Sequence, residues 1–334
     1  MAAILVTGGA GYIGSHTSLQ LIESGHNVVV LDNLYSGHRW AVSADAEFYE
    51  GDIADPEIVR DVLARHHIEA VVHFAGHIVV PESVADPLKY YRNNVAGSLN
   101  LIQCCMATGV NQFVFSSSAA VYGIPKSVPV AEDADKDPIN PYGMTKLMTE
   151  WTLSDLAAAE ADFRYVALRY FNVAGAHIGG GLGQATPEAT HLIKVACQTA
   201  TGQRPEMSVF GDDYDTVDGT CVRDYIHVDD LAKAHLDALN YLSKGGDSLA
   251  LNCGYGRGYS VREVIDMVKK VSGVDFKVRQ EGRRAGDPAE LVANNQQIRH
   301  RFKWEPRYAD LETICRSAYE WELKLLESGR QSGN

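Results

Sequence analysis

Three glycines, Gly8, Gly11 and Gly14, follow the apolar run Ala3–Thr7 at the start of the chain. The first glycine allows a tight turn after a strand, the second lets a pyrophosphate approach the backbone, and the third lets a helix pack closely on the strand. Asp32 ends the next apolar run and lies 18 residues after Gly14, close to the spacing of about 20 in dinucleotide-binding units. A carboxylate there accepts hydrogen bonds from a ribose diol and repels a 2′-phosphate. The sequence therefore predicts a Rossmann-type site for NAD rather than NADP.

Short runs of Val, Ile, Leu and Phe alternate with helical patterns through the first half of the chain. Continuous apolar strands between helices are typical of a parallel sheet that is covered on both faces. We expect an α/β fold, a Rossmann-type doubly wound parallel sheet with a smaller α/β C-terminal substrate lobe. The expected strands are Ala3–Thr7, Asn27–Leu31, Glu47–Tyr49, Ala70–Phe74, Gln112–Ser116 and Tyr165–Tyr170, and the expected helices are Ser15–Ser24, Pro56–His66, Leu88–Thr108 and Tyr142–Ala159.

The character of the sequence changes after about Asn172. A glycine-rich stretch at 175–183 and an aspartate-rich stretch at 211–219 are expected to be loops, and helices are expected at 187–201, 229–243, 260–272 and 310–326. No linker rich in Pro or Ser separates the halves, so two closely packed lobes with a cleft between them are expected. We predict an NAD-binding domain at 1–175 and a substrate-binding lobe at 176–334, some segments of which return to the first domain.

The charge balance disfavours several classes of partner. Acidic residues exceed basic ones by 43 to 30, and the net charge of -13 disfavours non-specific binding to nucleic acid or to an anionic membrane. No apolar run approaches the roughly 18 residues of a membrane span, and the first residues do not have the pattern of a signal peptide. The six cysteines show no C-x-x-C spacing and the twelve histidines no H-E-x-x-H. We expect free thiols in a reducing cytoplasm and no metal site.

Tyr142 and Lys146 are four residues apart at the start of an expected helix, so they lie one turn apart on the same face. Ser118 ends a strand, at the sheet edge where ligands bind in open α/β folds. A positive charge about 5 Å from a phenol, at an effective dielectric of about 20, is worth roughly 3 kcal/mol. Lys146 could supply one such charge and an oxidised nicotinamide another, and either is expected to lower the pKa of Tyr142 towards neutrality. These residues predict hydride transfer, in which Tyr142 takes the proton of a secondary alcohol and Ser118 hydrogen-bonds the same oxygen.

Three other segments are expected beside the cofactor. Asp52 follows the third strand and could bond the adenine amino group, and the small residues of Phe74-Ala75-Gly76 suit a backbone that lies against the cofactor. Asn93 lies early in the long helix that follows. For Asp52 and Asn93, capping or a solvated helix face is an equally good interpretation.

At these residues the chain resembles the extended short-chain dehydrogenase/reductase superfamily, and within it the bacterial UDP-glucose 4-epimerase family. The resemblance covers nearly the whole chain. It is carried by the segments Thr7–Gly14, Leu31–Leu34, His73–Gly76, Tyr90–Val95, Phe115–Gly123, Arg169–Asn172, Val222–Val228 and Arg283–Asp287.

The resemblance implies reversible interconversion of UDP-glucose and UDP-galactose. Tightly bound NAD oxidises the sugar at C4, the 4-keto sugar rotates, and hydride returns to its other face, with Tyr142, Lys146 and Ser118 as catalytic residues. A role in galactose metabolism, a cytoplasmic location and a homodimer are also implied, the dimer forming through the helices Leu88–Thr108 and Met144–Ala159.

By motif position, the resemblance also implies contacts with both ligands, and it places Arg223 and Arg284 on the diphosphate. The implied cofactor contacts are Gly8, Gly11, Tyr12, Ile13, Gly14, Asp32, Asn33, Ser36, Gly37, Asp52, Ile53, Phe74, Ala75, Gly76, Asn93, Ser116, Tyr142, Lys146 and Phe171. The implied substrate contacts are Ser118, Tyr142, Asn172, His191, Leu192, Val209, Phe210, Arg223, Arg284 and Asp287.

The chain departs from the family pattern at three positions. Ile78 stands where some epimerases have a lysine near the cofactor, and His191 stands where an asparagine often precedes the Leu192 position. Leu291 aligns with the position whose bulk limits the substituent on sugar C2. Tyrosine there excludes N-acetyl sugars and a small residue admits them, so leucine leaves acceptance of UDP-GlcNAc and UDP-GalNAc open.

Several related activities compete with this interpretation. Nucleotide-sugar dehydratases and decarboxylases need an acid/base pair directly after the serine, but Ala119 and Ala120 stand there and cannot transfer protons. A UDP-glucuronate epimerase would need a dedicated cation, and no obvious one occurs in the sequence. A non-catalytic NAD-binding regulator would typically lose Tyr142 or Lys146, and both are present.

Overall fold

The computed structural model of the chain describes residues 2–186, 190–284 and 286–329. Its centre is a seven-stranded parallel sheet in the order β10-β6-β5-β4-β1-β2-β3. The strand order reverses between β1 and β4, which creates the switch point where ligands bind in doubly wound folds. The strands of this sheet are β1 (Ala3–Thr7), β2 (Asn27–Asp32), β3 (Glu47–Glu50), β4 (Ala70–His73), β5 (Gln112–Ser118), β6 (Arg164–Tyr170) and β10 (Leu249–Cys253).

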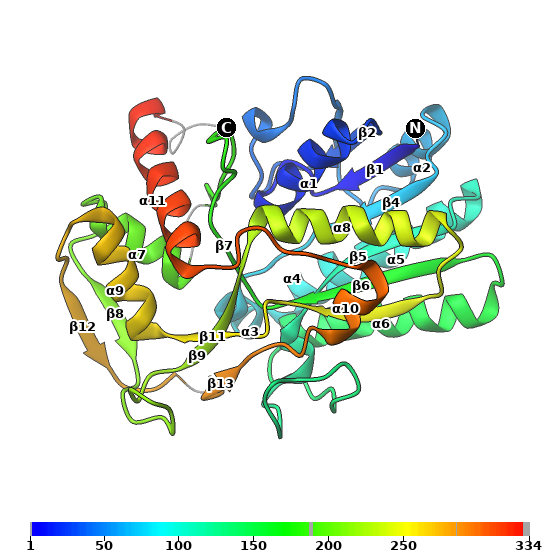
Figure 1. Cartoon of the computed structure of the whole chain (residues 1–334). Coiled ribbons are helices and arrows are strands. Elements are labelled where there is room, and N and C mark those ends of the chain that lie inside the picture. Colours follow the sequence, from blue (N-terminus) through cyan, green and yellow to red (C-terminus); the bar gives the residue numbers. More distant parts are fainter. Residues whose placement is uncertain (1, 187–189, 285, 330–334) are drawn as a thin grey trace.

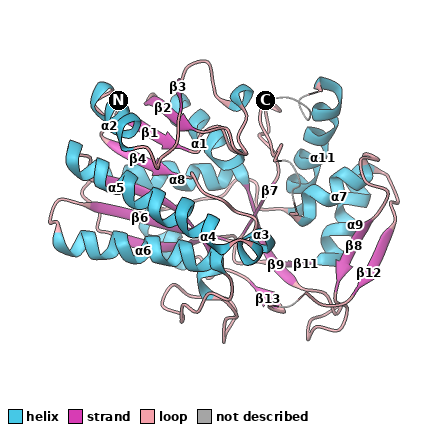
Figure 2. Cartoon of the chain, turned by 180° about the vertical axis from the view of Figure 1, so that it is seen from behind, coloured by secondary structure: helices cyan, strands magenta, loops and turns pink. Residues whose placement is uncertain are grey.

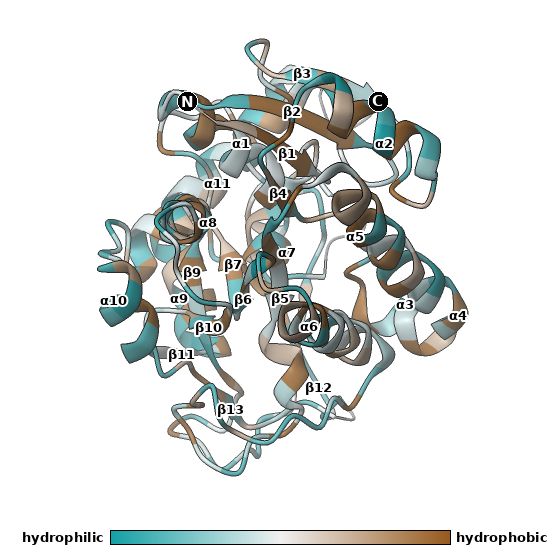
Figure 3. Ribbon diagram, turned by 90° about the vertical axis from the view of Figure 1, so that its right-hand side faces the viewer, coloured by the Kyte–Doolittle hydropathy of each residue, from teal (hydrophilic) through white to brown (hydrophobic). Residues whose placement is uncertain are grey.

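Helices cover both faces of this sheet (Figures 1 and 2). On one face lie α1 (Tyr12–Glu23) and α8 (Val228–Ser243), and on the other lie α2 (Pro56–Arg65), α5 (Gly97–Thr108) and α6 (Pro141–Ala159). Hydrophobic residues, brown in Figure 3, gather on β1, β2 and β4 between these helices. The buried apolar strands form the core from which the site residues project at the carboxyl edge.

A second lobe lies beside the carboxyl edge of the sheet, on the left of Figure 1. Its helices α7 (Leu192–Ala200), α9 (Val261–Ser272) and α11 (Leu311–Ser328) pack around a separate apolar cluster. The described residues of the lobe form two small sheets. The strands are β7 (Asn172–Ala174), β8 (Met207–Phe210), β9 (Val222–His227), β11 (Gly258–Ser260), β12 (Val278–Glu281) and β13 (Glu290–Leu291).

The structure confirms the predicted fold class and, apart from the helix predicted at Leu88–Thr108, the strands and helices predicted for the first half, with ends shifted by a few residues. The helix predicted at 187–201 is corrected, because α7 begins at Leu192, and residues 187–189 lie outside the described part. Helices α3 (Val80–Ala85) and α10 (Gln296–Phe302) were not predicted from the sequence, and neither was strand β10, which comes from the second half and pairs with β6. The domain boundary near residue 175 stays a prediction.

The helix predicted at Leu88–Thr108 is divided into three parts. A short helix α4 (Pro87–Tyr90) leads into a π-helical segment, Tyr91–Ala96, and then into α5. Such wide turns often occur at functional sites, because they turn side chains out of the regular helical register. Here the π-helical segment contains Asn93, one of the predicted cofactor contacts, and Asn94.

No helix in the described ranges combines the length and the apolar character that crossing a membrane requires. Within the same ranges, no group of three or more His, Cys, Asp or Glu side chains is arranged to hold a metal ion. All six cysteines are buried free thiols.

Candidate active site

A cavity of about 880 Å³ lies between the carboxyl edge of the sheet and the second lobe. It begins at the glycine turn after β1, passes the ends of β2, β4 and β5, and reaches Arg223 and Arg284 in the second lobe. This volume is near the upper end of the range typical for ligand pockets, so the cavity has room for a large ligand or for two ligands together.

The glycine turn is sterically obligatory. Gly8 has a φ of +71°, and its N–H donates to the backbone oxygen of Leu31 at 2.9 Å. A Cβ atom on Gly14 would lie 2.2 Å from the backbone oxygen of Gly8, so only glycine allows α1 to pack this closely. No described side chain caps α1, whose N-cap is Gly11. The amide groups of the first helical turn are therefore suited to bind an anionic group such as a pyrophosphate.

The carboxylate of Asp32 is held in place at the end of β2. Its two oxygens accept hydrogen bonds from the N–H groups of Ala10, at 3.0 Å, and Leu34, at 2.8 Å. Burial raises the pKa of Asp32, and the two backbone donors oppose that change. The nearby Asp52 accepts a hydrogen bond from the Asn33 amide at 2.9 Å. Both carboxylates line the cavity at its nucleotide end.

This half of the cavity fits a dinucleotide. The tight glycine turn, the uncapped start of α1 and the carboxylate at the end of β2 match a pyrophosphate followed by a ribose diol. Gly76 lies on the continuation of this surface, where an added Cβ would be 3.7 Å from the Lys146 nitrogen. The surface thus runs without interruption from the phosphate end to the reactive side chains.

The π-helical segment connects this surface to α6 through Asn94. The buried Asn94 side chain accepts a hydrogen bond from the N–H of His77 at 2.8 Å and donates to the backbone oxygen of the same residue. It also donates to the Thr145 hydroxyl at 3.2 Å. The neighbouring Asn93 lines the cavity and donates to Asn94. The segment that follows β4 is thereby tied to the helix that carries Tyr142 and Lys146.

Tyr142 and Lys146 lie together on α6, both almost fully buried. Helix α6 begins where Asn140 caps the N–H of Gly143 and Pro141 occupies the first turn, so local sequence fixes the position of Tyr142. Lys146 donates to the backbone oxygen of Ser116 at 2.8 Å, and its nitrogen is 5.9 Å from the centroid of the Tyr142 ring.

The expectation that Lys146 lowers the pKa of Tyr142 was wrong for this structure. Burial raises the pKa of Tyr142, and the only opposing contribution comes from the Ser118 hydroxyl. Burial also lowers the pKa of Lys146 to about 8, against the influence of Glu150 one turn further along the helix. The cost of removing both groups from water exceeds the mutual stabilisation that their spacing suggested.

Ser118 ends β5 and lies in the cavity wall beside Ala119 and Ala120. Its hydroxyl also accepts a hydrogen bond from the N–H of Ala120 at 3.2 Å, at the start of a short 3₁₀ turn. Behind it, Ser117 donates to Glu150, which forms a buried ion pair with Arg169. This pair fixes the strand end that presents Ser116 and Ser118.

The substrate half of the cavity contains two arginines. The Arg223 guanidinium lies 3.8 Å from a carboxylate oxygen of Asp287, and the Arg284 guanidinium stacks 3.7 Å from the centre of the Phe210 ring. Asn172, His191 and Leu291 line the same half. Two cations here suit a diphosphate, because each offers several N–H donors.

The structure brings most of the predicted site residues into one cavity wall. The exceptions are Leu192, which borders a smaller neighbouring cavity, Val209, which is buried in the apolar cluster of the second lobe, and Phe210, which supports Arg284. Their direct contact with substrate stays a prediction. Tyr35, His77 and Gln184 also line the cavity but were not predicted, because they belong to none of the recognised motifs.

Comparison with known proteins agrees with this geometry. Residues 4–254 match the NAD dependent epimerase/dehydratase family. The UDP-glucose 4-epimerase of Azospirillum brasilense is 55% identical over 330 residues, which are 99% of this chain and 94% of that protein.

Solved structures give the same result. The crystal structure of UDP-glucose 4-epimerase from Brucella ovis in complex with NAD has a TM-score of 0.93 and 46% identity, covering 96% of this chain and 98% of that one. The UDP-Glc/GlcNAc 4-epimerase from Campylobacter jejuni has a TM-score of 0.86 and 51% identity, covering 97% and 100%. The resemblance noted from the motifs is therefore confirmed, and this chain belongs to the NAD dependent epimerase/dehydratase family as a close relative of the UDP-glucose 4-epimerases.

Proposed function

We propose that the protein interconverts UDP-glucose and UDP-galactose at C4 with a retained NAD. The observation that carries the proposal is the meeting of Tyr142, Lys146 and Ser118 at one end of the dinucleotide surface, next to two alanines. The alanines matter because they leave no second acid or base beside Tyr142. Such a site supports removal and return of hydride but not elimination of water.

The chain's own residues account for the proton and for orientation. Tyr142 takes the proton of the sugar 4-hydroxyl, and Ser118 hydrogen-bonds the same oxygen. Burial alone raises the pKa of Tyr142, so its phenolate form would depend on the positive charge of an oxidised nicotinamide beside it. A bound NAD would supply the hydride acceptor for C4 and, once reduced, the hydride donor. On the return step Tyr142 gives its proton back to the 4-oxygen, so the balance of protons and electrons closes within one turnover. Lys146 places a buried positive charge near the site of proton transfer. Its hydrogen bond to Ser116 also keeps the end of β5 close to that site.

We assign the cofactor to the surface from Gly8–Gly14 through Asp32 to Gly76, within the proposed domain 1–175. The substrate diphosphate is assigned to Arg223 and Arg284, within the proposed lobe 176–334. This division leaves the 4-keto sugar free to rotate about its diphosphate linkage while the nucleotide stays fixed. The remaining predicted contacts follow the same division.

Acceptance of N-acetylated UDP-sugars is the second candidate. Leu291 lines the cavity on β13, where it pairs with Arg223, and its side chain is smaller than tyrosine. The Campylobacter jejuni relative is a UDP-Glc/GlcNAc 4-epimerase. For UDP-glucuronate, the cavity offers no further Lys or Arg among its described lining residues beyond Lys146, Arg223 and Arg284.

A homodimer through α5 and α6 and a cytoplasmic role in galactose metabolism complete the proposal. Trp151 on α6 is 53% exposed and Leu99 on α5 is 38% exposed, which supports a partner on this face. Leu147 does not belong to that face, because it is fully buried against the protein's own core. Sedimentation at micromolar concentration tests the dimer, and a monomer alone would contradict it.

The test of function uses purified protein without added NAD. Its bound NAD is first quantified after denaturation, UDP-galactose is then supplied, and UDP-glucose is detected with a coupled dehydrogenase. We expect UDP-glucose to form in proportion to the NAD-loaded fraction. If NAD-replete protein forms none, the proposal is wrong. Turnover of UDP-GalNAc and UDP-glucuronate in the same assay defines the substrate range.

A further inference from the structure

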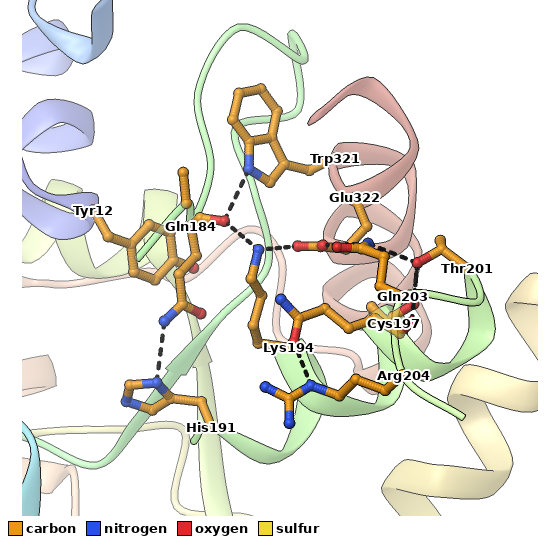
Figure 4. A network of polar contacts seen from close by, with 12 residues as sticks. Tyr12, Gln184, His191, Lys194, Cys197, Thr201, Gln203, Arg204, Trp321 and Glu322 are labelled. Carbon is orange, nitrogen blue, oxygen red and sulfur yellow. Dashed lines mark hydrogen bonds and ion pairs between the residues drawn. The ribbon is translucent and has the colours of Figure 1, made fainter. Parts of the chain in front are cut away.

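A buried polar network lies behind the substrate half of the cavity and joins three segments of the chain (Figure 4). Lys194 on α7 forms an ion pair with Glu322 on α11, and both side chains are at most 5% exposed. Lys194 also donates to the backbone oxygen of Gln184 at 2.8 Å. The Trp321 indole donates to the same oxygen at 3.1 Å. Two donors occupy both lone pairs of this carbonyl, so the backbone at Gln184 is fixed.

The side chain of Gln184 extends from this fixed point to His191. Its amide nitrogen lies 3.1 Å from Nδ1 of the His191 ring, as Figure 4 shows. An amide nitrogen can only donate, so Nδ1 must accept and cannot carry a proton. A neutral ring with Nδ1 as acceptor carries its proton on Nε2. The His191 side chain is exposed to the cavity, whose walls partly desolvate the ring and lower its pKa.

Gln184 and His191 both line the large cavity, which also contains Arg223 and Arg284. No hydrogen-bond partner for Nε2 of His191 occurs in the parts of the chain that the structure describes. With Nδ1 engaged by Gln184, Nε2 is the ring atom left for a ligand. An N–H there would donate to an anionic oxygen, whereas the other tautomer would present a lone pair and repel it.

We propose that Gln184 is a positioning residue that fixes His191 in the Nε2–H tautomer, so that the ring donates a hydrogen bond to an oxygen of the substrate diphosphate. Lys194, Trp321 and Glu322 hold Gln184 in this role. The proposal rests on the proposed function, because the acceptor oxygen is that of a UDP-sugar. It also gives a reason why Lys194 and Glu322 form a buried ion pair at a place remote from the reacting carbon.

The tautomer is measured directly by ¹⁵N NMR on holoenzyme labelled at histidine. The His191 signals are assigned from their loss in His191→Asn, and spectra are recorded at pH 9 so that the ring stays neutral. We expect a protonated Nε2 and an unprotonated Nδ1 in the native protein. In Gln184→Glu the carboxylate accepts from Nδ1, and the two signals exchange character. A protonated Nδ1 in the native protein would overturn the proposal.

The kinetic consequence is tested with the same variants. Gln184→Glu should raise KM for UDP-galactose about tenfold with kcat changed less than about twofold, because a hydrogen bond to a charged group is lost. The matched control is Gln203→Leu, which removes a donor to Glu322 in the same network but does not reach His191. This control should leave KM and the tautomer unchanged.

A His191→Asn background separates the effect of the tautomer on KM from the effect of the added negative charge. In a His191→Asn protein there is no tautomer to select, so Gln184→Glu should change KM by less than about twofold. A tenfold increase that persists there would overturn the proposal in favour of simple charge repulsion. The NMR result does not depend on turnover, so a failure of the proposed function, seen as no activity of the native protein on UDP-galactose, is distinguishable from a failure of this positioning role.

Discussion

The Lys146 ammonium group donates to the backbone oxygen of Ser116 at 2.8 Å instead of contacting the Tyr142 hydroxyl. Lysine therefore connects helix α6 to the end of strand β5. Burial dominates both groups, raising the pKa of Tyr142 and lowering that of Lys146 to about 8. The site holds two titratable groups whose charged forms are disfavoured by the protein interior.

Replacing Tyr142 by phenylalanine should abolish proton transfer while leaving the fold intact. The ring still fills its buried position, but no oxygen remains to accept the substrate proton, so kcat should fall by at least about 10³-fold. Bound NAD per subunit, measured after denaturation, should stay within about 20% of the native amount. Ser118→Ala should have a smaller effect, because it removes a hydrogen bond but leaves the base. Near-native turnover by Tyr142→Phe would exclude Tyr142 as the base.

Gly14→Ala should remove the cofactor from the purified protein. The new Cβ would lie 2.2 Å from the Gly8 oxygen, so α1 must move away from the turn that we propose receives the pyrophosphate. The NAD content after extensive dialysis is the measurement. Gly181→Ala is the matched control, because a Cβ there meets no atom within 4 Å and its φ is not in the left-handed region. Full NAD retention by Gly14→Ala would show that the turn does not hold the cofactor.

Removing one partner of the buried ion pair between Glu150 and Arg169 should destabilise the protein more than replacing both partners with apolar residues. Glu150→Gln leaves the guanidinium without a counter-charge and should lower the free energy of unfolding by about 3–5 kcal/mol. The double change Glu150→Leu with Arg169→Met should cost clearly less, because no unpaired charge stays buried. Urea unfolding of both variants provides the measurement. If the double variant is the less stable of the two, the pair itself is a net source of stability.

An exposed pair provides the control for this comparison. Lys126 and Asp135 form an ion pair in which both side chains are more than 70% exposed. Asp135→Asn should leave the unfolding midpoint unchanged within error, because solvent screens such pairs. A large effect there would mean that the loss in Glu150→Gln cannot be attributed to burial.

Much of this architecture follows from local patterns in the sequence. The apolar strands of the first half and the glycine turn are recognisable because each signal lies within about 30 residues. Strand β10 was missed because only part of it is fully buried and its pairing with β6 joins residues about 80 positions apart. The π-helical segment was missed because its apolar spacing resembles that of an ordinary helix.

The residues proposed to be reactive could be named from the sequence where a motif contains them, as for Tyr142, Lys146 and Ser118. The sign of the Tyr142 pKa shift was not predictable, since it depends on how much water the folded protein removes from the phenol. Gln184 gave no signal, because it is a single amide at the end of a glycine-rich stretch. Its role emerges only when α7 and α11, far apart in sequence, meet at its backbone oxygen.

Acid should destabilise the protein through three histidines that are buried in neutral form. Burial lowers the pKa of His16 to about 4, of His73 to about 3 and of His235 to about 4. The unfolded chain takes up a proton at each near pH 6.5 while the folded chain does not, so the free energy of unfolding falls as pH drops below 6.5. Each histidine contributes about 1.4 kcal/mol in total between pH 7.5 and 5.5, or roughly 4 kcal/mol for the three. Urea unfolding at the two pH values measures the loss. His235→Leu should reduce it by about a third, and an unchanged loss would show that His235 is protonated in the folded state.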